Sequence, residues 1–174
     1  MSPSNLFRWS GLATILGGVL LPMSWILRFV VGVQRPLSGT VEFVATILLV
    51  FGFMGVYGSQ NEETGTLGFL GFLLITVSNC IALGECWLQN GEPTGVAVVL
   101  GPLVGITMLL GFISLGIASW KANKLPRWTA VLWVIGGALI VPGFAVQEIL
   151  VVLGGVIQGT GVVGAGVKLW TSTD

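Results

Sequence analysis

Four charged side chains near the ends of apolar segments are the residues of this chain best suited to chemistry. They are Arg28, Glu42, Glu85 and Glu148. Carboxylates at the mouth of a helical bundle attract cations or amines, whereas an arginine among them forms ion pairs that hold helix ends together. Charges inside or beside a membrane span are expected to be paired. We therefore favour the ion pair and keep a cation- or amine-attracting vestibule as the alternative.

Two amide side chains lie deeper, within apolar segments. Asn79 is flanked by Thr76 and Ser78, and Gln158 stands near the middle of the last segment. A buried amide in lipid needs a hydrogen-bond partner, and a neighbouring helix often supplies it. We expect bonds between helices at both positions, with contact to a substrate, pigment or quinone as the alternative for Asn79.

The sequence contains no recognisable catalytic constellation. The chain has no histidine, which excludes histidine-ligated haem, histidine-rich zinc sites and histidine-based triads. The pattern Gly159-Thr160-Gly161-Val162-Val163-Gly164 matches a dinucleotide-binding fingerprint, but it lies in an apolar segment without a βαβ unit. We expect no catalytic residues, no metal and no cofactor, so the protein is not expected to be an enzyme.

The charge content identifies the class of protein. Among 174 residues there are seven basic and seven acidic ones, 54% of the residues are apolar, and the mean hydropathy is +0.98. A soluble domain needs much more polar surface, and a nucleic-acid binder needs clustered positive charge. The sequence therefore predicts an integral membrane protein with one transmembrane domain over residues 1–174 and no nucleic-acid partner.

Polar and turn residues divide the chain into six apolar segments. We expect helices at about 9–33, 41–58, 66–88, 96–120, 128–146 and 149–167. These segments are too long and continuous for barrel strands, and a helix satisfies its own backbone hydrogen bonds in lipid. The predicted fold is an all-α polytopic membrane bundle of six transmembrane helices.

Similar sequences at three helix starts indicate a possible internal repeat. Arg8-Trp9-Ser10 precedes Gly17-Gly18, Arg127-Trp128-Thr129 precedes Gly136-Gly137 at the same offset, and Thr66-Leu67-Gly68 is a weaker match. Three repeated helical hairpins would account for the spacing. The alternative is that glycine-rich apolar sequences resemble one another by chance.

The basic residues predict the orientation. One side of the predicted bundle has Arg8, Lys121, Lys124, Arg127 and Lys168, whereas the other has Arg28 and Arg35. Basic residues concentrate on the cytoplasmic side of membrane proteins. We expect both termini in the cytoplasm and the protein in the cell (inner) membrane.

The last segment is rich in small residues. Glycines recur at positions suited to close helix contact: Gly154, Gly155, Gly159, Gly161 and Gly164. Such surfaces let helix backbones approach each other in a membrane. We expect a packing helix, preferably within the chain and alternatively against another subunit.

Short motifs at the predicted inner helix ends resemble those of a known group. Gly55-Val56-Tyr57-Gly58-Ser59-Gln60, the stretch from Thr64 to Gly71, and Leu125-Pro126-Arg127-Trp128 resemble small multi-pass bacterial membrane proteins. The resemblance implies a multi-pass fold. That group carries no activity to transfer, so no residue roles are taken from it.

Three functions are compatible with these features. The first is a non-catalytic accessory or scaffolding subunit in a larger membrane assembly, with membrane lipid and other subunits or further copies of the chain as partners. The second is a small-solute or ion transporter or channel that uses the outer carboxylates. The third is a binder of lipid, quinone or carotenoid. Few ionisable groups fall near the predicted midplane, which favours the first.

Overall fold

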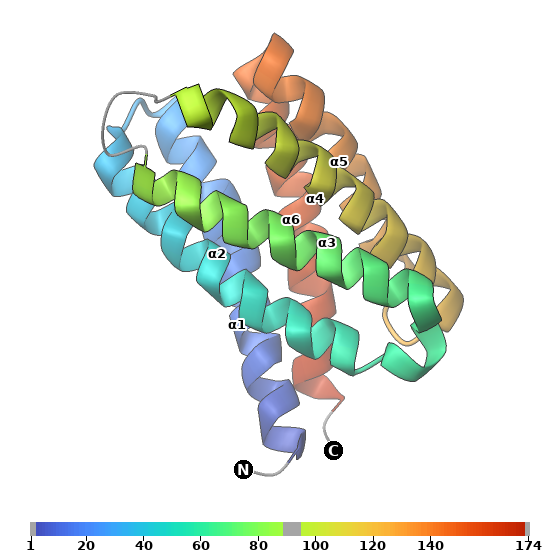
Figure 1. The fold of residues 1–174 in the computed structure, drawn as a ribbon. Coiled ribbons are helices and arrows are strands. Elements are labelled where there is room, and N and C mark those ends of the chain that lie inside the picture. The colour runs from blue at the N-terminus through green and yellow to red at the C-terminus, as the bar shows by residue number, and fades with distance from the viewer. Residues whose placement is uncertain (1–2, 89–94, 173–174) are drawn as a thin grey trace.

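The computed structural model describes residues 3–88 and 95–172, and it is helical almost throughout (Figure 1). The elements are α1 (Pro3–Trp25), the π-helical segment η1 (Ile26–Val30), α2 (Arg35–Gly58), α3 (Asn61–Leu88), α4 (Gly95–Ala122), α5 (Arg127–Val146) and α6 (Glu148–Thr171). Within the described residues, six helices are long and apolar enough to cross a membrane. The predicted all-helical membrane bundle is confirmed to that extent, and the hairpin repeat stays a prediction.

Several helices begin earlier than their apolar segments. The second begins at Arg35 rather than at residue 41, and Pro36 lies in its first turn, where the missing N–H removes no helical hydrogen bond. The residues Asn61–Thr64, expected in a loop, form the first turn of α3. Gly65 then interrupts the helix with φ +56° and ψ −152°, a conformation open to glycine. The predicted start at Thr66 therefore coincides with the helix that follows this break.

The first membrane segment ends irregularly. The regular helix α1 contains Pro22 and stops at Trp25, after which η1 continues to Val30 with Arg28 in its last turn. The backbone N–H of Val31 donates to the carbonyl oxygen of Ile26, five residues earlier, which is the wider hydrogen-bond spacing of a π-helix. The helix expected to reach residue 33 therefore ends sooner and carries Arg28 on a widened turn.

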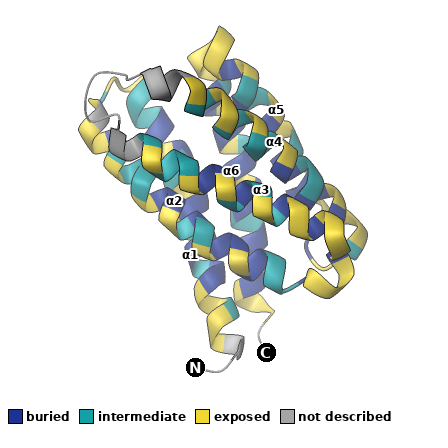
Figure 2. Ribbon diagram, viewed as in Figure 1, coloured by how far each residue is buried: buried dark blue, intermediate teal, exposed yellow. Residues whose placement is uncertain are grey.

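The helices form a ring. Each one packs against its neighbours in the chain, and α6 also packs against α1 and closes the ring. Both termini lie at the same end of the bundle (Figure 1). Coverage is uneven, because 50% and 56% of the apolar windows of α1 and α6 are buried, against 28% and 22% for α3 and α4. The exposed surface of α3 and α4 is visible in Figure 2.

Glycines bring α6 close to two neighbours. A Cβ atom on Gly154 would lie 2.7 Å from the carbonyl oxygen of Gly136 on α5, and one on Gly155 would lie 2.5 Å from the ring of Trp25 on α1. The remaining glycines of the predicted packing set follow the same division: Gly159 faces α1, whereas Gly161 and Gly164 face α5. All five therefore contact helices of the same chain.

Replacing Gly154 by alanine tests this close contact. We expect Gly154→Ala to lower the free energy of unfolding by about 1–3 kcal/mol, because the new methyl group overlaps backbone atoms that cannot move away easily. The matched control is Gly105→Ala on α4, where the nearest atom is 3.7 Å away on Val141. The free energy of unfolding of both variants is measured in mild detergent, and equal values for the two variants would contradict the expectation.

Candidate functional site

The outer charged residues occupy different helix contacts. Arg28 is half-buried on η1, with its guanidinium 4.8 Å from the centre of the Phe29 ring. Glu42 is half-buried on α2 and accepts a hydrogen bond of 3.3 Å from Nε1 of Trp25 on α1. This bond fixes the Glu42 carboxylate at the contact between α1 and α2, near the end of the first membrane segment.

The other two carboxylates differ in exposure. One carboxylate oxygen of Glu85 is buried and lies 3.6 Å from the position of a Cβ atom on Gly101, so Glu85 faces α4. Glu148 is exposed in the first turn of α6, where a negative charge interacts favourably with the helix dipole. The half-buried Arg28, Glu42 and Glu85 all have interaction partners, as charges in such positions require.

The amide of Asn79 is satisfied within its own helix. Its Nδ2 donates a hydrogen bond of 2.8 Å to the carbonyl oxygen of Ile75, one turn earlier. The bond between helices that we expected of Asn79 is made by its neighbour, because the Ser78 hydroxyl donates to the carbonyl oxygen of Val104 on α4 at 3.0 Å. Asn79 therefore stabilises α3 locally, and Ser78 joins α3 to α4.

Gln158 lies at the contact of α5 and α6 with 2% of its surface exposed. Its Cβ packs against Gly136, and its Nε2 is 3.6 Å from the position of a Cβ atom on Gly137. Within the described residues this Nε2 has no hydrogen-bond partner, and the same is true of Nε1 of the fully buried Trp133. Gln158 therefore packs between the helices without making the hydrogen bond expected of its amide nitrogen.

Sequence reasoning missed Gln60. We expected this residue in a polar loop, but its side chain is fully buried and its Nε2 donates a 2.8 Å hydrogen bond to the Ser119 hydroxyl on α4. Nothing in the sequence distinguishes it from its polar neighbours. Its burial follows from the short turn between α2 and α3, which places Gln60 against the end of α4.

Three aromatic rings fill part of the interior. Phe53 of α2, Phe112 of α4 and Trp133 of α5 have ring centres 5.5–6.1 Å apart, and each has at most 2% of its surface exposed. Edge-to-face and tilted arrangements of this kind add to the free energy gained from burial. Where these rings meet, the space between the three helices is closed.

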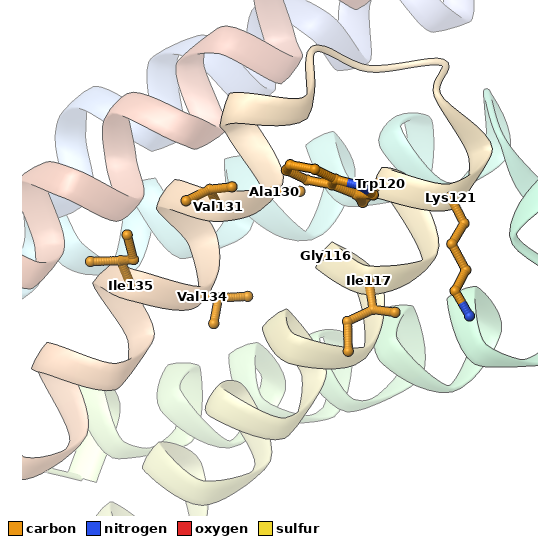
Figure 3. Close-up of a pocket in the computed structure, with 8 residues that line it drawn as sticks. All are labelled: Gly116, Ile117, Trp120, Lys121, Ala130, Val131, Val134 and Ile135. Carbon is orange, nitrogen blue, oxygen red and sulfur yellow. The ribbon is translucent and has the colours of Figure 1, made fainter.

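A groove opens on the outside of the bundle between α4 and α5 (Figure 3). Its volume is about 330 Å³ and its walls are almost entirely apolar. Trp120 and Lys121 lie at the end of the groove nearest the α4–α5 loop (Figure 3). This volume is at the lower end of the range of ligand-binding pockets, and the apolar walls suit a small apolar group.

The loop beside this groove is basic. Lys124 forms an ion pair with Glu63 at 2.8 Å, and this pair raises the pKa of Lys124. Arg127 donates a 3.2 Å hydrogen bond to Oδ1 of Asn123, and its guanidinium lies 5.6 Å from the centre of the Trp120 ring. The contacts that Arg127 makes with Asn123 and Trp120 are both with neutral side chains.

The arrangement of the described side chains also bears on metal binding. Across residues 3–88 and 95–172, no three His, Cys, Asp or Glu side chains lie close enough together to hold a metal ion. No protein-family model, curated protein or solved structure matches the chain. The bundle has two distinctive surfaces, the sparsely covered face of α3 and α4 and the groove between α4 and α5.

The Gln60–Ser119 hydrogen bond should contribute to stability. We expect Ser119→Ala to lower the free energy of unfolding by about 1–3 kcal/mol, because it leaves a buried amide without its acceptor. The control is Ser114→Ala on the same helix, since Ser114 makes no side-chain hydrogen bond in the described part of the chain. A thermal unfolding series in detergent compares them, and similar melting temperatures would contradict the expected role.

Gln158 should behave in the opposite way. We expect Gln158→Met to leave the free energy of unfolding unchanged or to raise it by about 1 kcal/mol, because it removes a buried donor that makes no bond and keeps the side-chain volume. Asn79→Leu is the comparison, since that change removes a formed hydrogen bond. Chemical denaturation of both variants is the measurement. A loss of more than about 2 kcal/mol for Gln158→Met would show that its amide nitrogen is bonded in solution.

Proposed function

We propose that the protein is a non-catalytic membrane subunit that packs against other transmembrane helices in a larger assembly. The observation that carries this proposal is the uneven coverage of the ring, in which α3 and α4 are much less buried than α1 and α6. Large apolar side chains project from both helices, including Val77 on α3, 41% exposed, and Ile106 on α4, 53% exposed. We infer that a partner helix covers this α3–α4 face through close steric fit, since lipid could cover the apolar side chains equally well.

The interior supports a structural role more than transport. A transporter of small solutes or ions binds its cargo near the middle of the membrane, at polar or broken-helix sites. Here the rings of Phe53, Phe112 and Trp133 pack together between α2, α4 and α5. The carboxylate of Glu148 is exposed at a helix start, which favours the subunit over a vestibule that would use this residue.

The proposal includes the orientation of the bundle in the membrane and its origin from repeated hairpins. We propose that both termini face the cytoplasm of a cell with an inner membrane, since the basic α4–α5 loop lies at the same end as the termini. We also propose that the helices arose as three hairpins. The extensive packing of α1 on α2, α3 on α4 and α5 on α6 supports this origin.

Photo-crosslinking from the two faces of the bundle tests the proposed subunit contact. A photoreactive amino acid at Val77 or at Ile106 is expected to give the same protein adduct in native membranes. The control position is Leu153 on α6, which is equally exposed at 50% but lies outside the α3–α4 face. We expect Leu153 to give lipid adducts only.

A functional companion experiment uses the native complex in mild detergent. Ile106→Gln is expected to dissociate the complex, so that the protein has the size of the isolated chain, because the variant places an amide in the contact. Leu153→Gln is expected to leave the complex assembled. Lipid adducts at all three positions, together with a monomer that moves a solute in liposomes, would replace the subunit with the transporter. In that case slower transport by Glu85→Gln would implicate the outer carboxylates.

A further inference from the structure

We propose that the groove between α4 and α5 binds an anionic phospholipid. One acyl chain would lie in the groove, and the phosphate of the headgroup would lie between Lys121 and Arg127. This inference goes beyond the proposed subunit function, because the site is formed by this chain alone and requires no partner protein.

The shape of the groove fits an acyl chain. Small residues form its deepest part, with Gly116 on α4 facing Ala130 on α5, and Val131 and Ile135 extend its wall along α5. The groove holds about 330 Å³, is nearly free of polar surface, and is open toward the outside of the bundle. At this depth the surrounding medium is hydrocarbon, so a lipid chain is the molecule available to fill it.

The loop end of the groove lies at the level expected for headgroups. Trp120 and Trp128 are 43% and 49% exposed on either side of the loop, and tryptophan concentrates at the boundary between hydrocarbon and headgroups. Lys121 is among the residues that line the groove, and its side chain extends away from the α5 residues Val131 and Ile135 (Figure 3). Long basic side chains commonly place their charge at the interface in this way.

The charges at this end select a negative headgroup. Of the three basic residues, Lys124 is already paired with Glu63, whereas no ion pair within the described residues neutralises Lys121 or Arg127. The Arg127 guanidinium lies over the ring of Trp120, which lines the groove, at 5.6 Å from the ring centre. Two cations without carboxylate partners beside one apolar groove match one phosphate and one acyl chain, with an anionic lipid preferred over a zwitterionic one.

Native mass spectrometry of the delipidated full-length protein tests the site. Phosphatidylglycerol and phosphatidylcholine with identical acyl chains are the two probes. We expect tighter binding of phosphatidylglycerol, and we expect Lys121→Gln and Arg127→Gln each to weaken it about fivefold. Arg127→Lys should retain most of the binding, since it keeps the charge. The double variant Glu63→Gln/Lys124→Gln is the matched control and should leave the affinity unchanged, because it removes both charges of one ion pair and keeps the local net charge.

A variant within the groove distinguishes the contribution of the acyl chain to binding from that of the headgroup. Val131→Phe is expected to weaken both lipids, because the ring occupies the apolar part of the groove, while melting temperature without added lipid checks that the variant is folded. Equal binding of the two lipids by the unchanged protein would overturn the proposal. So would equal losses for the double variant Glu63→Gln/Lys124→Gln and for Lys121→Gln, which would indicate a diffuse basic surface, or unchanged binding by folded Val131→Phe.

Discussion

The close contact of α6 with both α1 and α5 is the constraint on which the rest of the bundle depends. Lipid tails are as apolar as leucine side chains, so burial of apolar surface alone gives membrane helices little reason to associate. Here glycine allows backbone to approach backbone, as where Gly154 meets Gly136. Dispersion contacts over such a smooth surface favour association. They also fix which faces of α1 and α5 point inward, and thus where Trp133 and its aromatic neighbours meet.

Directional bonds between helices are few in the described part of the chain. Most hydroxyl groups bond to a carbonyl oxygen of their own helix, as Thr14 does with Ser10 and Thr46 does with Glu42. The bonds that cross between elements include Ser78 to Val104 and Gln60 to Ser119, which involve α4, and Trp25 to Glu42, which joins α1 to α2. Different helix contacts are therefore held by different forces. Steric fit dominates around α6, whereas hydrogen bonds supplement it around α4 and between α1 and α2.

The sequence was sufficient for the helical class because long apolar segments admit few alternatives in lipid. It was less informative about boundaries, since polar residues such as Asn61 can form a helical turn at the membrane surface. It could not show whether Asn79 or Ser78 faces the next helix, because adjacent residues differ by about 100° around a helix axis. The groove was also out of reach. It depends on Gly116 and Ala130 meeting across two helices whose relative position only the folded bundle defines.

Closure of the ring by α1 and α6 has a consequence for the order in which the chain folds. The helix that covers the glycines of α1 is the last of the six to leave the ribosome, whereas α3 and α4 are neighbours in the chain and can pair early. Until α6 inserts, Gly11 and Gly18 of α1 lack the helix that they contact in the finished bundle. Synthesis and insertion of α6 is therefore the step at which an open row of helices becomes a closed ring.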